Sequence, residues 1–570
     1  MPDTECSQTD VAPPSAGATR AWGFFPLLMV ALVVLYGLGV NGHWRFQRDS
    51  ALYMGLARSL AETGQYRFNH AAHTLALPGF PLLLSLVYRT VGESFLAMNV
   101  LLSLFGLGCV AVAYLLYRRL PLSTAEVGAC ILLFGLSRTL YYYSTHVMTD
   151  VPFTSLVLVA LYCGLRMLQE DGRASWAWCV GASAACCAAT AVRPFGPAVA
   201  VALLAGLWLR RSWRAHWLAN AGKSMIVVLP LLLVVWAWAA YCDAVPRESS
   251  ANYYSAMLAR RSTTRIASEG LGRLPAILDA VPDAFAGVGM GYMGATMLSI
   301  LMVAGLVRTL MRGNVLLPVY AGVYMGGVLI GHPGRRYLLP VLAIMVYWLV
   351  VGAGLVAAWL VERPRRFLWP AAGFWCVMAV ELFVSLPLAV AAAALVVSAL
   401  IWAAVGWWIY GKHEAVVTRR RVAVLGRVLL GMILAANLLR VSKIVQEARS
   451  ADFYRVSEGS RIAAYFEVMD RLKGLVQPDD VVLTYESRLV HYFTRARASR
   501  LPRRWGGDGI DDLARLLKRL NVRYLIVDAE RSRKVDLVDD LLLARPDAFH
   551  KLGGSGPLAL LEVTPERLGG

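Results

Sequence analysis

Long apolar stretches recur along the chain from Trp22 to about Arg440 and are separated by short polar connectors. A helix needs roughly 20 predominantly apolar residues to cross ~30 Å of hydrocarbon, because its backbone polar groups must be hydrogen-bonded internally. The pattern therefore predicts an α-helical polytopic membrane protein with about 13 spanning helices. Their expected ranges are 23–41, 95–117, 124–140, 150–166, 176–192, 194–210, 224–241, 292–310, 315–331, 337–360, 367–384, 386–410 and 423–440.

The pattern changes after about residue 440, where charged residues become frequent and the long apolar runs stop. Segments at 481–485, 522–527 and 558–563 predict strands. Amphipathic patterns at 457–473, 510–520 and 534–543 predict helices between and before them. Residues 441–570 are therefore expected to form a small α/β domain. This domain shows no Gly-rich phosphate loop and no nucleophile motif, which favours a binding, capping or stabilising role over catalysis.

The composition agrees with a membrane protein, since 58% of the residues are hydrophobic and only 16% are charged. Residues 22–440 are expected to form the transmembrane domain. The preceding residues 1–21 are polar and rich in Pro, Ser, Thr and Ala, which predicts a disordered tail.

Lys and Arg concentrate in alternate connectors, among them 118–119, 210–223, 363–366 and 412–421. Short loops that are rich in positive charge stay on the cytoplasmic side of the membrane. This rule predicts a cytoplasmic N-terminus, with loops 42–94 and 242–291 and the C-terminal domain outside. We expect an integral protein of the plasma membrane, namely the bacterial inner membrane. The net charge of +19 is then explained by topology and requires no nucleic-acid partner.

The first outer loop begins with a segment from Asp49 to Ala61 whose apolar residues fall mostly on one helical face, while Arg58 lies elsewhere. This pattern predicts a short helix that lies in the membrane interface, with Asp49 at its N-terminus. An apolar run at 82–87 predicts a second surface helix. Two such helices on one outer loop would enclose a partly buried vestibule. Asp150 is expected at the same membrane face, so the two carboxylates are candidates for one chemical site.

Several short motifs, taken in order, resemble the GT-C class of glycosyltransferases, which use sugars linked to polyprenyl phosphate. The closest branches are those of the protein mannosyltransferases and the lipid A aminoarabinose or galacturonic acid transferases. The resemblance extends to about residue 360. One departure is Ser50, where the mannosyltransferases usually carry an acidic residue, and this weakens the case for a protein acceptor. The motifs are Asp49-Ser50-Ala51-Leu52-Tyr53, the segment 57–64, Pro78-Gly79-Phe80-Pro81, Thr149-Asp150-Val151-Pro152, Arg193-Pro194 and Arg336-Tyr337-Leu338-Leu339-Pro340.

The resemblance implies transfer of a sugar from a polyprenyl phosphate to an acceptor hydroxyl on the extracytoplasmic face. Such transfer needs a base for the hydroxyl proton and cations for the leaving phosphate. Asp49 is the expected base, and Asp150 the expected second acid, which would position the acceptor or a metal ion. Each has a simpler alternative, because Asp49 and Asp150 each stand where a helix N-cap is expected.

Arg335 and Arg336 are the expected donor-phosphate ligands, because they place two guanidinium groups at an outer surface that is otherwise poor in positive charge. Binding to lipid headgroups is the alternative. Arg193 is expected either to bind phosphate or to pair with Asp150. The remaining candidates for substrate contact are Tyr53, Arg58, Tyr337, Arg260 and Arg261, of which the last two belong to a loop that could close over the substrate.

No cofactor is certain from the sequence, and a divalent metal ion remains an open alternative. His70, His73 and His146 are weak candidate ligands, and the first two would share a face if their segment were helical. Two other function classes also stay open. A multi-pass transporter would carry charged positions near the bilayer midplane, and a non-catalytic cell-envelope assembly protein could also carry an outer domain. The sugar and the acceptor, whether lipid, glycan or protein, are left undetermined.

Overall fold

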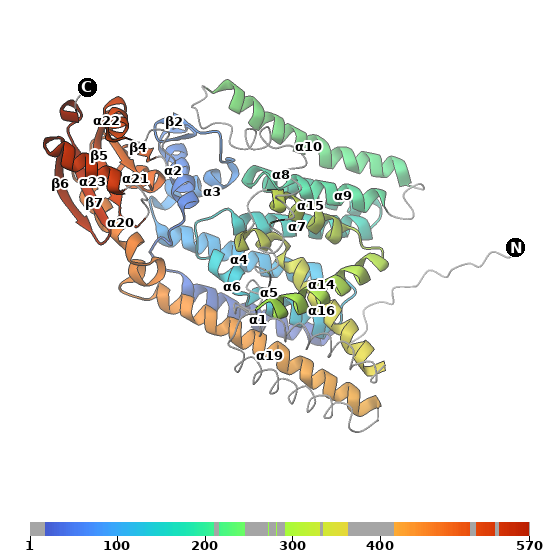
Figure 1. Ribbon diagram of the computed structural model, residues 1–570. Coiled ribbons are helices and arrows are strands. Elements are labelled where there is room, and N and C mark those ends of the chain that lie inside the picture. Colours follow the sequence, from blue (N-terminus) through green and yellow to red (C-terminus); the bar gives the residue numbers. More distant parts are fainter. Residues whose placement is uncertain are drawn as a thin grey trace.

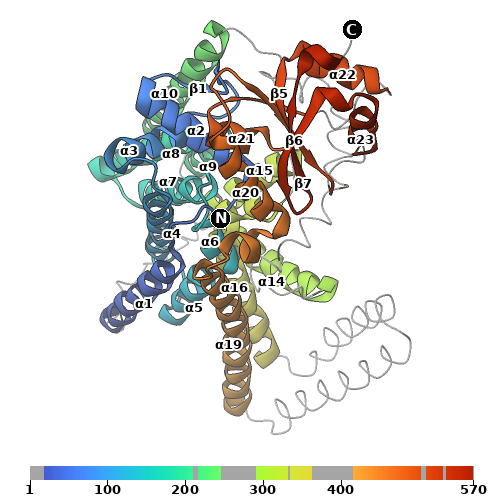
Figure 2. The ribbon, with the colours of Figure 1, turned by 90° about the vertical axis from the view of Figure 1, so that its left-hand side faces the viewer.

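The computed structural model describes residues 18–209, 216–245, 291–330, 334–362, 415–501, 509–530 and 535–568, together with Gly272 and Val281. Helices fill most of the described chain, and a small sheet lies at one end beside α2 and α3 (Figures 1 and 2). The helices of the apolar part are α1 (Ala18–Gly39), α4 (Phe95–Tyr117), α5 (Thr124–Gly135), α6 (Arg138–Tyr143), α7 (Asp150–Gln169), α8 (Gly172–Val192), α9 (Pro197–Trp208), α10 (Trp217–Ala244), α14 (Gly291–Met311), α15 (Leu316–Ile330), α16 (Leu339–Glu362) and α19 (Ala415–Ala448).

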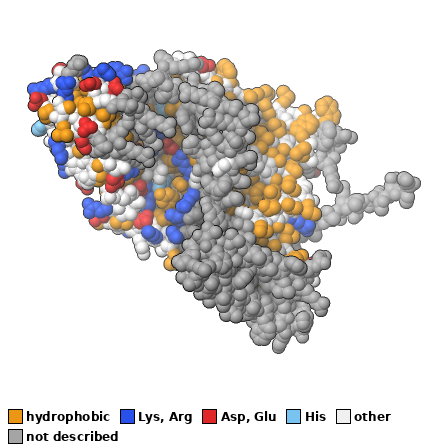
Figure 3. Space-filling view, viewed as in Figure 1, with side chains coloured by type: hydrophobic (Ala, Val, Ile, Leu, Met, Phe, Trp, Pro, Cys, Tyr) orange, Lys and Arg blue, Asp and Glu red, His pale blue; other side chains and the backbone are white. Residues whose placement is uncertain are grey.

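Each expected span overlaps a described helix except 367–384 and 386–410, which lie outside the described residues. Within the described ranges, six helices are long and apolar enough to cross a membrane by length and composition. Their outer surfaces are apolar, as Trp236 on α10 shows with 65% of its surface exposed. In Figure 3 hydrophobic side chains predominate on the visible helical surface at the right, whereas most of the visible charged side chains lie toward the sheet at the left. The chain is therefore an integral membrane protein.

Two expected spans differ from the observed helices. The range 124–140 is wrong as one helix, because α5 ends at Gly135 and the Ser137 hydroxyl accepts a hydrogen bond from the Leu140 N–H, which starts α6. Helix α9 has only 12 residues, since it begins at Pro197 and ends at Trp208. Capping and proline chemistry therefore divide the apolar runs into shorter helices than hydropathy alone predicts.

Loop 42–94 folds into helix α2 (Arg48–Thr63), a hairpin of β1 (Arg67–Phe68) and β2 (Ala71–Ala72), and helix α3 (Gly79–Val91). Both predicted helices are present. The expectation that Arg58 lies away from the packed side of α2 is wrong. Nearly all residues from Ser50 to Arg58 are buried, because α2 packs against α3 and against α21 (Ser487–Thr494) of the C-terminal part.

The C-terminal part contains a five-stranded sheet with the strand order β4-β3-β5-β7-β6. Strands β4, β3 and β5 run parallel, and β7 is antiparallel to both of its neighbours. The three predicted strands are observed as β3, β5 and β7. The elements are η4 (Tyr454–Glu458), α20 (Ser460–Lys473), β3 (Val481–Thr484), α21, β4 (Arg497–Arg500), α22 (Ile510–Arg519), β5 (Val522–Asp528), α23 (Val535–Ala544), η5 (Pro546–Ala548), β6 (Phe549–Ser555), β7 (Leu558–Val563) and η6 (Pro565–Leu568).

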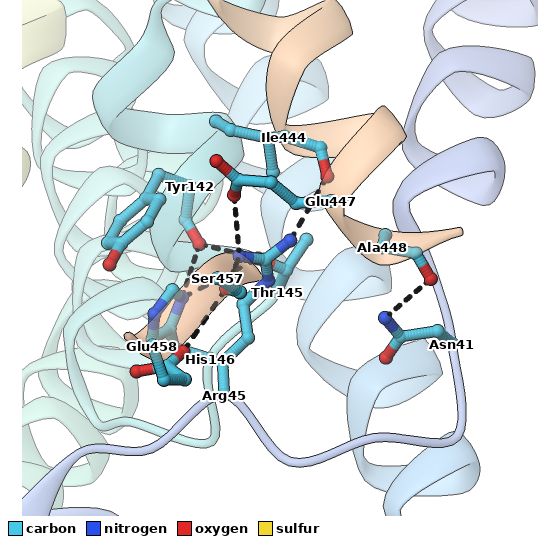
Figure 4. A network of polar contacts seen from close by, with 10 residues as sticks. All are labelled: Asn41, Arg45, Tyr142, Thr145, His146, Ile444, Glu447, Ala448, Ser457 and Glu458. Atoms are coloured by element: carbon cyan, nitrogen blue, oxygen red, sulfur yellow. Dashed lines mark hydrogen bonds and ion pairs between the residues drawn. The ribbon is translucent and has the colours of Figure 1, made fainter. Parts of the chain in front are cut away.

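A buried arginine joins the last helix of the apolar part to the start of loop 42–94 (Figure 4). Arg45, only 2% exposed, donates hydrogen bonds to the Ile444 carbonyl (3.0 Å) and to Ser457 Oγ (2.8 Å), and it also pairs with Glu447 (3.3 Å). The Asn41 amide donates to the Ala448 carbonyl (3.0 Å). These contacts fix the direction in which the chain leaves α19 and enters the C-terminal part.

Candidate functional site

Asp49 occupies the first turn of α2, one residue before Ser50. The residue that precedes this helix is Gln47, whose backbone N–H donates to Ser50 Oγ (3.3 Å). The interpretation of Asp49 as a simple N-cap is therefore wrong. Its carboxylate still lies at the positive end of the helix dipole, but both of its oxygens are turned to other elements.

Two arginines from distant parts of the chain hold the Asp49 carboxylate. Arg336, in the short helix η2 (Arg335–Leu338), places Nη1 3.1 Å from Oδ2. Arg488, in the first turn of α21, places Nη1 2.7 Å from Oδ1. Burial alone would raise the pKa of Asp49, but the two guanidinium groups outweigh it and the pKa is lowered. Asp49 is thus ionised at neutral pH and fixed in direction.

A second ion pair is buried among the apolar helices. Asp150 is fully buried at the start of α7, and its Oδ1 lies 2.8 Å from Nη2 of Arg193, which follows the end of α8. Arg193 Nε also donates to Thr149 Oγ1 (2.8 Å). Helix α7 begins after Thr149, which makes no side-chain cap bond, so the N-cap interpretation of Asp150 is wrong. Of the two alternatives for Arg193, pairing with Asp150 is the one observed.

Two tyrosines connect the pairs. Tyr337 accepts a hydrogen bond from Arg336 Nη2 at its hydroxyl (2.9 Å), and its ring lies 5.5 Å from the Arg193 guanidinium carbon. Burial raises the pKa of Tyr53 to about 12, with a further contribution from Asp49 and a smaller one from Asp150. The carboxylates Asp49 and Asp150 therefore belong to one charged cluster, as the sequence predicted.

Of the other residues expected to contact substrate, the two that the structure describes, Arg335 and Arg58, lie in different surroundings. Arg335 is exposed beside Arg336. Arg58 is buried under α21, where Nη2 donates to the Tyr492 carbonyl (2.7 Å) and the guanidinium lies over the Tyr492 ring. Arg260 and Arg261 lie outside the described residues.

Arg488 was not among the residues singled out from the sequence. A signal for it exists, because Arg488 lies just after β3, at the carboxyl end of a parallel strand, where open α/β sheets place their functional groups. Its partner Asp49 is 439 positions away along the chain. Sequence spacing alone does not connect two residues at that separation.

The three candidate histidines are each engaged elsewhere. The segment of His70 and His73 forms a hairpin, so it is not the helix in which the two would share a face. His70 Nε2 contacts the Arg495 carbonyl, and His73 Nε2 accepts from the Ala76 N–H (3.1 Å). His146 contacts the Tyr142 carbonyl through Nδ1 (2.7 Å), in the cluster of Figure 4. Among the residues that the structure describes, no three His, Cys, Asp or Glu side chains gather as metal ligands.

Residues 72–238 match the family model described as dolichyl-phosphate-mannose-protein mannosyltransferase. The matched range is less than half of the chain, and it includes Asp150 and Arg193. No curated protein matches the sequence.

The whole fold is similar to that of solved membrane proteins. ArnT from Cupriavidus metallidurans bound to undecaprenyl phosphate is 14% identical, with a TM-score of 0.59 over 96% of this chain and 99% of that one. The apo state of the same protein is 15% identical, with a TM-score of 0.56 over 97% and 100% of the two chains. The archaeal oligosaccharyltransferase AglB from Archaeoglobus fulgidus is 12% identical, with a TM-score of 0.53 over 93% of this chain and 73% of that one. These likenesses extend through both the helical part and the C-terminal sheet.

Proposed function

We propose that this membrane-embedded chain, which has the GT-C glycosyltransferase fold, is a glycosyltransferase. It would move a sugar from a polyprenyl-phosphate donor to an acceptor hydroxyl. The observation that carries this proposal is the Asp49 carboxylate held between Arg336 and Arg488, beside the buried pair of Asp150 and Arg193. A base and several cations then lie within one cluster. Lipid-phosphate sugar transfer requires this combination.

The ligands named in the similar structures support a polyprenyl phosphate as the carrier in the donor. One ArnT structure holds undecaprenyl phosphate, and the AglB structure holds an inhibitory peptide and a dolichol-phosphate. Both ligands carry a phosphate on a long isoprenoid chain. For the present protein we propose the same chemical class of donor, with a hexosyl or pentosyl group as the transferred sugar.

The proposed reaction is a displacement at the anomeric carbon of the donor sugar. Asp49 takes the proton of the acceptor hydroxyl, and the acceptor oxygen forms a bond to the anomeric carbon. The bond from that carbon to the phosphate oxygen breaks, and its electron pair stays on the polyprenyl phosphate. A carboxylate with a lowered pKa is a weak base, so orientation toward the acceptor must supply much of the rate.

The arginines have separate proposed roles. Arg336 and the exposed Arg335 would bind the donor phosphate and stabilise the charge that develops on it. Arg193 is already neutralised by Asp150, so this pair is better suited to hold α7 and α8 in place beside the phosphate. Asp150 would orient the acceptor through this framework without taking a proton.

The placement in the membrane is also proposed. Residues 22–440 would form the transmembrane domain, with 13 spans by the sequence pattern. The N-terminus would be cytoplasmic, and the loop that carries Asp49 and the domain 441–570 would lie outside the bacterial inner membrane. The positive connectors support this orientation.

The test compares membrane extracts by mass spectrometry from cells with the protein, without it, and with the Asp49→Asn variant. We expect a glycan product to disappear and a lipid-linked sugar to accumulate both without the protein and in the variant. Equal amounts of inserted variant and wild-type protein are the control. A product that persists with Asp49→Asn would remove Asp49 as the base. Unchanged extracts without the protein would favour a transporter or a non-catalytic assembly protein.

A further inference from the structure

Helix α21 binds the first outer loop through many contacts, and these contacts fix its position. Tyr492 Oη contacts Tyr88 Oη (2.9 Å), and its carbonyl accepts the bond from Arg58. His491 Nε2 accepts from the Asn69 N–H (2.8 Å). Arg48, at the first position of α2, donates to Glu486 just before α21 (2.8 Å). The backbone that carries Arg488 is therefore held firmly against α2.

The side chain of Arg488 is held much less firmly than that of Arg336. Arg336 bonds both to Asp49 and to Tyr337, and its side chain is 27% exposed. Arg488 is 39% exposed, and within the described ranges its hydrogen bonds and ion pairs all go to Asp49 Oδ1. Of the two guanidinium groups on Asp49, that of Arg488 can leave at the lower cost.

The proposed reaction requires one Asp49 oxygen to accept a proton, but both oxygens are occupied in this structure. Each carboxylate oxygen has two lone pairs and can accept a second hydrogen bond, so an acceptor hydroxyl either joins the arginine on one oxygen or replaces it. Arg336 is tied to Tyr337 and lies toward the proposed phosphate site, so its departure would cost a second hydrogen bond. Oδ1 is therefore the oxygen that the acceptor hydroxyl can approach at the lower cost.

On the basis of the proposed function, we propose that Arg488 is a positioning residue for Asp49, supplied by the C-terminal part. It holds Oδ1 in the orientation in which that oxygen meets the acceptor hydroxyl, while Arg336 keeps Oδ2 in place. The C-terminal part then completes the catalytic cluster. This role goes beyond the binding, capping or stabilising role that the sequence favoured.

The charged and titratable groups around Asp49 are few among the described residues. They are Arg336 with Tyr337 on one side, Arg488 on the other, and Tyr53 on α2 itself. Asp150 acts on Arg336 from further away, and Arg488 also faces His73, whose pKa burial lowers to about 4. Removal of the Arg488 charge therefore takes away one of the two cations that lower the pKa of Asp49.

Helix α21 supplies a matched control. Arg495, at its C-terminal end, pairs with Glu62 of α2 (2.8 Å). Arg488→Gln and Arg495→Gln each remove one ion pair between the same two helices, and only the first touches Asp49. Arg488→Lys keeps the charge and serves as the conservative variant.

The first measurement is the labelling of Asp49 by a water-soluble carbodiimide and an amine, followed by peptide mass spectrometry across pH. This reagent modifies protonated carboxyl groups. We expect the pH midpoint of labelling to rise by about one unit in Arg488→Gln, in line with the effect of one adjacent arginine. It should stay at the wild-type value in Arg495→Gln and close to that value in Arg488→Lys. An unchanged midpoint in Arg488→Gln, or an equal shift in both Gln variants, would overturn the proposal.

The second measurement is turnover, with the lipid-linked sugar extracted from cells that lack the protein as the donor. We expect turnover in Arg488→Gln to fall about tenfold or more because the base is misoriented. The KM for the lipid donor should change little, and the acid limb of the pH profile should move upward. Wild-type turnover in Arg488→Gln would overturn the positioning role, while loss of transfer in Asp49→Asn would still support the proposed function. Transfer that persists in Asp49→Asn would remove Asp49 as the base, and absence of transfer by the wild-type protein would overturn the proposed function itself.

Discussion

Arg193 and Asp150 form an ion pair of 2.8 Å in which Asp150 is fully buried and the Arg193 side chain is 9% exposed. The pair joins the start of α7 to the residue after α8, and α7 is the most deeply buried of the candidate membrane spans. Taking two charges out of water is costly, and their mutual attraction can offset this cost only in good geometry. Each charge therefore depends on the other.

The first prediction concerns the loss of one partner of this pair. Asp150→Asn leaves the Arg193 guanidinium buried without a counter-charge, and we expect a destabilisation of about 3–5 kcal/mol. Thermal unfolding in detergent and the yield of inserted protein would measure it. The double variant Asp150→Asn with Arg193→Met should regain part of that stability. An Asp150→Asn variant as stable as the wild type would contradict this account of the pair.

The second prediction concerns the close approach of α14 and α16. A Cβ atom added to Gly305 would lie 2.0 Å from the Trp348 carbonyl oxygen, and one added to Gly352 would lie 1.8 Å from that of Leu301. We expect Gly352→Ala to force the two helices apart and to lower the melting temperature clearly, because close helix contact in membranes depends on small residues. Gly326→Ala on α15 is the control, since open space surrounds that position. Equal melting temperatures in both variants would contradict the observed packing.

The third prediction concerns donor binding. Arg336→Gln removes the guanidinium that contacts Asp49 and Tyr337, and we expect the affinity for undecaprenyl phosphate to fall roughly ten- to a hundredfold. This range follows from the about 1.5–3 kcal/mol contributed by a hydrogen bond to a charged group. Arg312→Gln, which changes an exposed cation that donates to the Pro121 carbonyl, is the control. Titration of the lipid phosphate into the purified variants would measure both, and equal affinities would exclude Arg336 as a phosphate ligand.

The fourth prediction concerns Glu458 in η4, close to Arg45 in the cluster of Figure 4. Burial raises its pKa to about 7, although Arg45 acts in the opposite direction. A raised carboxyl pKa means that the folded state favours the protonated form. The contribution to stability is full below about pH 4.5 and is lost as the pH rises through about 7.

Glu458→Gln removes this pH dependence, because the amide resembles the protonated acid. We expect the variant to melt higher than the wild type at pH 8, with the difference shrinking as the pH falls toward 5. Melting curves at several pH values would measure it. Parallel pH dependences in the two proteins would show that Glu458 ionises freely in the folded state.

The sequence predicted the elements that show a regular spacing of apolar residues or an apolar run of characteristic length. Apolar runs located the described helices of the membrane part, and alternating segments located β3, β5 and β7. Asp49 and Arg336 could be proposed because both stand next to an apolar segment in a region where charge is rare. The capping residue Ser137, which divides 124–140 into two helices, is a local feature that an average over many residues hides.

The contacts between distant segments could not be predicted in this way. Arg488 meets Asp49 only because α21 packs on α2, and that packing depends on side chains such as Arg58 and Tyr492 from both parts of the chain. The amphipathic pattern of α2 indicates that one face is covered. It does not say whether lipid or protein covers it.

The most direct test of the central claim uses the lipid-linked sugar that accumulates without the protein. This lipid is incubated with purified wild-type protein or Asp49→Asn in the presence of membrane acceptor, and the free polyprenyl phosphate that is released is measured over time. The account predicts release by the wild type in proportion to the protein added. It predicts that the variant binds the lipid-linked sugar. The variant should release free polyprenyl phosphate at least about a hundredfold more slowly than the wild type, as expected for loss of a general base. Release by Asp49→Asn at the wild-type rate would contradict the account.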